Sequence, residues 1–237
     1  MYTAKQLAKM IDHSILHPTM TDEDLVKGCE MAIAYNVASV FVKPYAVKKA
    51  HEILKDSGVA AGCVVGFPHG NSTTQVKVFE TELAIKDGAA EIDMVINIGK
   101  AIEGDWDYIE HEISEIVHVT KKNNVILKVI FENDYMPDDE HKIRLCRICS
   151  KLKVDYVKTS SGYGFVKGDD GRYSYRGATE HDVGLMRRYS GHGVGVKAAG
   201  GVRTLDEMLR MVEKGASRLG ASATKTILDE AVRRFGR

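Results

Sequence analysis

The sequence predicts an α/β fold, and within that class a single (β/α)8 (TIM) barrel over residues 1–237 with a short N-terminal helix. Short apolar runs alternate strictly with amphipathic helical segments, and parallel strands are the kind that need such a crossover between them. Eight strand-and-helix units also fit well into 237 residues. An open doubly wound sheet is the alternative, but the first turn lacks the G-x-G-x-x-G of a dinucleotide-binding domain.

Each strand is predicted from an apolar, often β-branched run that ends at Gly, Pro or a polar turn. The predicted strands cover residues 11–16, 38–42, 59–66, 91–97, 125–131, 154–158, 193–197 and 217–219.

Each helix is predicted from an apolar stripe at helical spacing, and several begin at a capping signal. Thr3 with Gln6, Ser72 with Gln75, and Thr204 with Glu207 have the spacing of a capping box. The predicted helices cover residues 3–9, 21–35, 47–55, 72–85, 105–121, 138–152, 180–189, 204–214 and the remainder to 235.

The composition argues against a nucleic-acid-binding or membrane-bound protein. Lys plus Arg equals Asp plus Glu at 33 each, so no overall charge attracts the chain to nucleic acid or an anionic membrane. No signal peptide or membrane-spanning run is recognisable, and we expect a cytoplasmic protein. Cys146 and Cys149 form a Cys-x-x-Cys, but without a second pair or a nearby histidine they are read as helical thiols one turn apart. No metal or cofactor is expected.

Polar residues interrupt the predicted strands, and in a barrel of this kind the functional groups gather at the carboxyl ends of the strands. If these side chains point inward they converge on one pocket. They are Asp12, Ser14, Asp93, Lys128, Lys158 and Lys197.

Lys158 is the central candidate, because it ends an apolar strand at Ser160-Ser161-Gly162. Burial and neighbouring cations such as Lys128 and Lys197 lower the pKa of a lysine, and a neutral amine can attack a carbonyl to form a Schiff base. Asp93 can accept a proton or hold one ammonium in place. Each residue also has a plainer interpretation: Lys158 and Lys197 as solvated strand ends, and Asp93 with Lys128 as a buried ion pair.

Glycine-rich turns follow the last predicted strands. Backbone amides at two successive helix starts form a familiar phosphate site in barrels, although Gly-Gly alone is more often a close-packing device. The candidate phosphate-site residues are Ser161, Gly162, Gly201, Arg203, Gly220 and Ser222.

The motifs around these residues resemble those of the deoxyribose-phosphate aldolases. The resemblance rests on V-K-T-S-S-G at 157–162, V-K-A-A-G-G-V-R-T at 196–204 and E-I-D-M-V-I-N-I-G at 91–99, and it continues through 11–16, 65–70 and 219–222. It implies a metal-independent class I aldolase that cleaves 2-deoxy-D-ribose 5-phosphate, as a homodimer or homotetramer.

The resemblance also implies roles for single residues. Lys158 would be the Schiff-base lysine, Lys197 the cation that depresses its pKa, and Asp93 a partner in proton transfer. Lys128 would join the proton network and Asp12 and Ser14 would face the sugar hydroxyls. The phosphate would be held by Gly162, Gly201, Gly220 and Ser222.

Some positions depart from the family pattern. Phe41 stands where many members have a cysteine, and Ala223 where a second phosphate-site serine is common. Residues 164–179 are longer and more charged than the usual connection, and are interpreted as a solvated excursion, a subunit contact or a lid. Two alternatives remain: an aldolase that forms an imine with another phosphosugar, and a non-catalytic sugar-phosphate-binding barrel.

Overall fold

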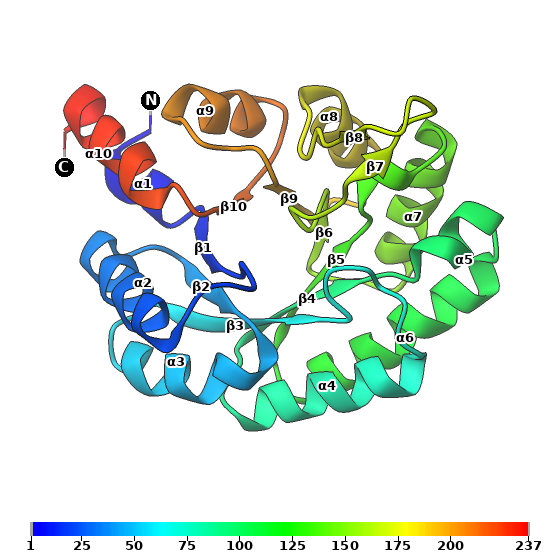
Figure 1. Cartoon of the computed structure of the whole chain (residues 1–237), viewed down its shortest axis with the longest axis horizontal. Helices are drawn as coiled ribbons and strands as arrows, with labels where there is room; N and C mark the ends of the chain where they lie inside the picture. The colour runs from blue at the N-terminus through cyan, green and yellow to red at the C-terminus, as the bar shows by residue number, and fades with distance from the viewer. Residues whose placement is uncertain (1, 237) are drawn as a thin grey trace.

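The computed structural model describes residues 2–236 and forms a closed barrel of eight parallel strands ringed by helices (Figure 1). The barrel order is β1, β10, β9, β6, β5, β4, β3 and β2. The strands are β1 (Ile11–Ile15), β2 (Ser39–Val42), β3 (Ala60–Val65), β4 (Glu91–Val95), β5 (Ile126–Ile130), β6 (Tyr156–Lys158), β9 (Gly195–Ala199) and β10 (Arg218–Ala221). The predicted fold class and all eight predicted strands are therefore confirmed.

Helices connect the strands as predicted. They are α1 (Ala4–Ala8), α2 (Asp22–Tyr35), α3 (Val47–Leu54), α4 (Thr74–Lys86), α5 (Ile98–Glu103), α6 (Trp106–Lys122), α7 (Asp139–Lys151), α8 (Glu180–Tyr189), α9 (Leu205–Glu213) and α10 (Thr224–Phe235). Short 3₁₀ turns occupy Pro44–Ala46 and Asn133–Tyr135. Among the described residues, no helix combines the length and the apolar character needed to cross a membrane.

The helix starts test the three predicted capping boxes. The Thr3–Gln6 and Thr204–Glu207 boxes are present. The Ser72–Gln75 box was wrong, because Thr73 caps α4 by accepting a hydrogen bond from the amide of Val76. With the cap shifted by one residue, the third helical position is Val76, which has no side-chain oxygen to close a box.

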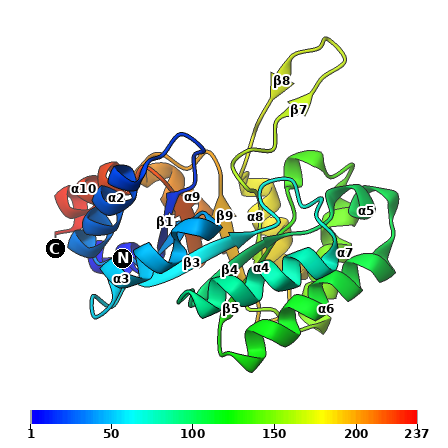
Figure 2. The same ribbon diagram turned by 60° about the horizontal axis from the view of Figure 1, so that its bottom comes forward.

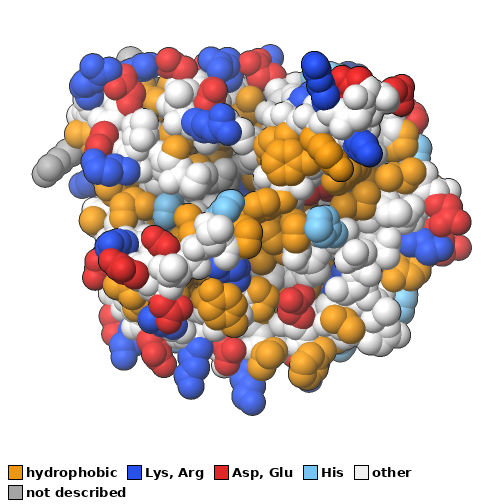
Figure 3. All heavy atoms as spheres, viewed as in Figure 1, with side chains coloured by type: hydrophobic (Ala, Val, Ile, Leu, Met, Phe, Trp, Pro, Cys, Tyr) orange, Lys and Arg blue, Asp and Glu red, His pale blue; other side chains and the backbone are white. Residues whose placement is uncertain are grey.

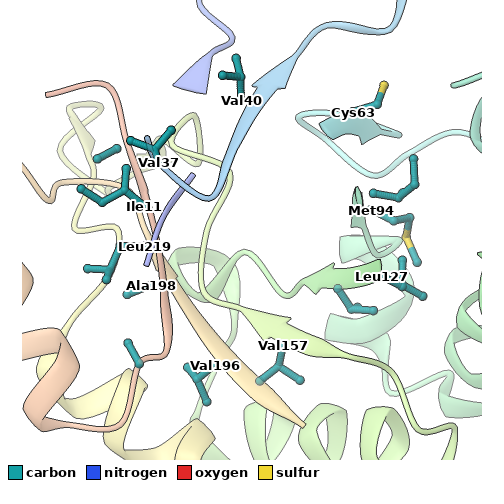
Figure 4. Close-up of a cluster of buried hydrophobic side chains, with 14 of the residues drawn as sticks. Ile11, Val37, Val40, Cys63, Met94, Leu127, Val157, Val196, Ala198 and Leu219 are labelled. Carbon is teal, nitrogen blue, oxygen red and sulfur yellow. The ribbon is translucent and has the colours of Figure 1, made fainter. Parts of the chain in front are cut away.

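Side chains alternate between the two faces of each strand. One set points outward and packs against the helices as the main apolar core, including Ile11, Val40, Leu127, Val157 and Val196 (Figure 4). The inward set is different: a small apolar group around Phe41 and Val64 accompanies many polar and charged side chains. The barrel interior therefore contains the polar and charged side chains from which an active site can form.

Residues 164–179 form a hairpin that the sequence did not predict. Its strands β7 (Val166–Lys167) and β8 (Tyr173–Ser174) pair antiparallel. The hairpin stands away from the barrel at the end where β6 and β9 finish (Figure 2). This segment has no alternating apolar pattern, so its two short strands leave no local signal in the sequence. Helix α5 was also not predicted, because its six residues are too few to show a helical stripe.

Candidate active site

Three lysines and one aspartate, from four strands, meet inside the barrel. Oδ2 of Asp93 on β4 accepts a hydrogen bond from Nζ of Lys158 on β6 at 2.7 Å and from Nζ of Lys197 on β9 at 2.6 Å. Nζ of Lys128 on β5 lies 3.4 Å from Oδ1 of the same carboxylate. The structure therefore brings these four predicted residues together, and Asp93 joins two amines through one oxygen.

A second group of charged residues lies nearer the amino ends of the strands. Arg218 on β10 donates hydrogen bonds to Asp12 at 2.9 Å through Nε and to Glu91 at 2.8 Å. Lys128 donates to Glu91, and Lys197 lies 2.6 Å from Oδ2 of Asp12. Lys197 is thereby held between two carboxylates, those of Asp12 and Asp93.

Asp12 lies deeper than a residue that faces the sugar hydroxyls, the role that the resemblance implies. Its side chain is fully buried and does not line the cavity. The reason is that Arg218 and the hydroxyl of Ser39 occupy the same level and bond its Oδ1. Asp12 therefore acts on Lys197, and Ser14, two residues further along β1, is the one that lines the cavity.

Burial and charge together set the ionisation of this cluster. Burial opposes the charge on Asp93, but Lys158, Lys197 and Lys128 hold the pKa of its carboxyl well below the usual range. Burial lowers the pKa of Lys197 to about 8, against the opposing effect of Asp12 and Asp93. Lys197 is thus a group that gains and loses a proton close to neutral pH, as a proton carrier must.

Phe41 lies against two of the cations. Nζ of Lys197 is 4.0 Å and Nζ of Lys128 4.4 Å from the centre of its ring, within the range of a cation–π contact. The ring fits because the facing residue on β3 is Gly62, where a Cβ would lie 2.5 Å from a ring carbon. Phe41 therefore fills the interior beside the lysines with an aromatic face.

A cavity of about 550 Å³ opens above the cluster, with a mixed polar and apolar lining. Figure 3 looks onto this end of the molecule, where hydrophobic side chains gather near the middle. The predicted residues that line the cavity are Ser14, Lys158, Ser161, Gly162, Gly201, Arg203, Gly220 and Ser222. The others, Asp12, Asp93, Lys128 and Lys197, are buried beneath it.

The two predicted helix starts differ in what they offer a phosphate. At α9 the carboxylate of Glu207 accepts hydrogen bonds from the amides of Arg203 and Thr204, so these two donors are taken. At α10 the capping residue is Ala223, which provides no side-chain cap, and this leaves the first amides of a twelve-residue helix open next to Ser222. Helix α10 is therefore the better anion site of the two.

Sequence reasoning did not assign several site residues. Glu91 and Arg218 complete the buried charge network, and Glu132 accepts the amide of Ser161 at 3.0 Å. Tyr175 reaches the cavity from the hairpin. A signal existed for Glu91 and Arg218, since each is a charged residue within a predicted strand; none existed for Tyr175.

Other clusters offer little to a metal. Asp139, His181 and Asp182 come together, but Nζ of Lys142 lies 2.6 Å from Asp182 and 3.2 Å from Asp139. The ammonium already occupies the place a cation would take. Cys146 is a free, buried thiol, and burial raises its pKa to about 11, which makes it a poor nucleophile or ligand.

Comparison with known proteins gives a consistent result. The profile of the DeoC/LacD family aldolases matches residues 6–230. A deoxyribose-phosphate aldolase from Rhodopirellula baltica is 49% identical over 235 residues, covering 99% of this chain and 93% of the relative. One from Thermococcus gammatolerans is 44% identical over 227 residues, covering 95% and 96%.

Solved structures agree. An aldolase named QR15 has a TM-score of 0.87 at 32% identity and covers 96% of both chains. The tetrameric deoxyribose phosphate aldolase from Aeropyrum pernix has a TM-score of 0.85 at 28% identity, with 96% of this chain and 92% of that chain covered. With its barrel, its clustered lysines and these matches over nearly its full length, the chain belongs to the DeoC/LacD family of aldolases.

Proposed function

We propose that this enzyme is a class I aldolase that reversibly cleaves 2-deoxy-D-ribose 5-phosphate to D-glyceraldehyde 3-phosphate and acetaldehyde. One observation carries the assignment of the nucleophile. Of the three clustered lysines, Lys158 alone lines the cavity, while Lys128 and Lys197 are buried beneath it. Only an amine that reaches the cavity can meet a substrate carbonyl.

The reaction follows from this geometry. The neutral Nζ of Lys158 attacks C1 of the open-chain sugar, and loss of water gives an iminium ion. A base removes the proton from the C3 hydroxyl, the C2–C3 bond breaks, and its electrons pass to the iminium to form an enamine while D-glyceraldehyde 3-phosphate leaves. Protonation at C2 and hydrolysis release acetaldehyde and restore Lys158.

Neighbouring groups supply charge and protons for these steps. Lys197, whose pKa is lowered to about 8, is suited to exchange a proton, and the carboxylate of Asp93 links it to Lys158 by accepting a hydrogen bond from each amine. Ser14 faces the sugar hydroxyls. The phosphate lies at Gly162, Gly201, Gly220, Ser222 and the start of α10, with Arg203 adding positive charge.

Borohydride reduction tests the proposal. We expect reduction with deoxyribose 5-phosphate to trap a stable adduct on Lys158, detected by mass spectrometry of peptides. Lys158→Met abolishes cleavage and leaves the circular dichroism spectrum unchanged. A trapped adduct with a preference for another phosphosugar supports a different aldolase, and no adduct under turnover conditions leaves a sugar-phosphate binder. Near-normal turnover by Lys158→Met refutes the choice of nucleophile.

We also propose that the chain forms a homodimer or homotetramer. Three apolar side chains on α4 are exposed at helical spacing, Val76, Phe79 and Leu83, and a second copy would cover them. The Aeropyrum pernix relative is described as tetrameric. Sedimentation velocity of the wild type and of Phe79→Glu tests this: we expect the variant to shift towards monomer.

We also propose that the enzyme is cytoplasmic, which fits its four buried free cysteines.

A further inference from the structure

The hairpin of residues 164–179 returns to the barrel at Tyr175. The outer part of the hairpin is solvent-exposed, and Tyr173 on β8 is 66% exposed. Tyr175, two residues later, is partly buried and lines the cavity together with Phe165 from the other arm. Their rings lie 5.4 Å apart between centroids. The base of the hairpin therefore forms one wall of the proposed substrate site.

Hydrogen bonds fix the backbone next to Tyr175. The carboxylate of Asp134, whose side chain is 3% exposed, accepts the amides of Arg176 and Gly177 at 2.9 Å each. The amide of Ala178 donates to the carbonyl of Gly200 at 3.0 Å. These bonds tie the chain just after Tyr175 both to the loop after β5 and to the loop after β9, so the ring is held in place before substrate arrives.

The hydroxyl of Tyr175 lies against the glycine turns assigned to the phosphate. A Cβ built on Gly200 would be 1.8 Å from this oxygen, and one on Gly162 would be 3.9 Å from it. Gly200 has φ of +86°, so its backbone conformation and the closeness of the tyrosine both require glycine. Gly162 and Gly200 also line the cavity.

This hydroxyl has no hydrogen-bond partner among the described residues and is closed off from solvent. A buried hydroxyl without a partner is unfavourable, and a site that leaves one so placed is suited to a ligand that supplies the missing acceptor. Burial, reinforced by the carboxylates of Glu132 and Asp134, raises the pKa of the Tyr175 phenol well above its usual range. The group therefore stays protonated and can donate a hydrogen bond at any working pH.

We propose that the Tyr175 hydroxyl donates a hydrogen bond to the phosphate of the substrate, which makes the hairpin a specificity element for phosphorylated over unphosphorylated sugars. The inference rests on the proposed function, since it concerns the phosphate end of the same site. A phosphate oxygen is a charged acceptor, and hydrogen bonds to charged groups are stronger than those between neutral ones.

Tyr175→Phe removes the hydroxyl and keeps the ring. For deoxyribose 5-phosphate we expect KM to rise by roughly 10- to 100-fold with little change in kcat, because a contact present in both ground and transition states is lost. For unphosphorylated 2-deoxyribose, kcat/KM should not change. Tyr173→Phe makes the same chemical change on an exposed residue of the hairpin and should behave like the wild type with both substrates.

Binding of a non-reacting phosphate separates this inference from the proposed reaction. In titration calorimetry we expect glycerol 3-phosphate to bind Tyr175→Phe roughly 10- to 100-fold more weakly than the wild type. If the wild type fails to cleave deoxyribose 5-phosphate, the proposed reaction is wrong, and this titration still decides the role of Tyr175. Equal or tighter binding by the variant overturns the inference, as does an equal loss of kcat/KM on both sugars.

Discussion

Lys158 on β6 and Lys197 on β9 are register partners, facing each other across adjacent parallel strands. Both donate a hydrogen bond to the same oxygen of Asp93. Two ammonium groups held this close repel each other, and Asp93 limits but does not remove that repulsion. The sheet register itself thus produces the electrostatic coupling on which the proposed imine chemistry depends.

The pH dependence of activity should report Lys197. Its pKa is lowered to about 8, so raising the pH through about 8 removes the proton that Lys197 carries. We expect kcat/KM of the wild type to fall on the alkaline side near that pH. In Lys197→Arg the cation persists, and the alkaline fall should move to a higher pH even if the maximum is lower. Lys27→Arg, on the exposed face of α2, is the control. An alkaline limb that stays near 8 in Lys197→Arg contradicts this assignment.

Sequence reasoning found the barrel and the lysine cluster because both leave local signals. An apolar run interrupted by Lys158 or Asp93 is visible in the chain, since an inward charge in a strand is unusual. Arg218 gave a weaker signal, because it lies at the start of a short strand of small residues and reads as exposed. The partners of Asp12 and the position of Tyr175 depend on which residues the closed barrel places at the same level, and no local pattern carries that information.

Arg218 should be essential to stability as well as to activity. Its guanidinium lies between Asp12 and Glu91, and all three side chains are almost completely buried. Arg218→Met leaves two buried carboxylates short of a partner, which costs about 3–5 kcal/mol in the free energy of unfolding. Activity should fall too, because Asp12 positions Lys197. Urea unfolding and steady-state kinetics measure both effects.

A surface ion pair provides the comparison for Arg218. Arg234 on α10 pairs with Asp206 and Glu230, but its side chain is 40% exposed. Arg234→Met should lower the free energy of unfolding far less than Arg218→Met does, and it should leave kcat unchanged. Similar losses of unfolding free energy in Arg218→Met and Arg234→Met would show that the buried network has no special role in stability.

Phe41 should protect the enzyme from aldehydes. A thiol at this position would lie beside the ammonium groups of Lys128 and Lys197, which lower the pKa of a cysteine and raise its reactivity. We expect Phe41→Cys to lose activity faster than the wild type during incubation in acetaldehyde. Phe41→Ala removes the ring without adding a thiol and should not show the acceleration. Equal rates for the two variants would exclude the thiol as the cause.

A second buried ion pair, outside the active site, should respond differently to single and double replacement. Nζ of Lys77 on α4 lies 2.6 Å from Glu112 on α6 and donates to the carbonyl of Val95 at 2.8 Å; both charged side chains are fully buried. Lys77→Met alone leaves the buried carboxylate of Glu112 without its cation and should lower the free energy of unfolding by about 3–5 kcal/mol. The double variant Lys77→Met with Glu112→Leu should recover part of that loss. Thermal and urea unfolding of the single and double variants measure the coupling.

The pairing of β1 with β10 has a consequence for how the chain reaches its active form. These neighbours lie at opposite ends of the sequence: Asp12 pairs in register with Gly220, and α1 packs beside α10 (Figure 1). Until Arg218 is synthesised, β1 and β9 each keep an open edge and Asp12 lacks one of its three neighbouring cations. The last strand, β10, therefore closes the barrel and also carries Arg218, the last cation of the buried charge network to be synthesised. Closure of the barrel and assembly of the catalytic cluster thus occur together, late in folding.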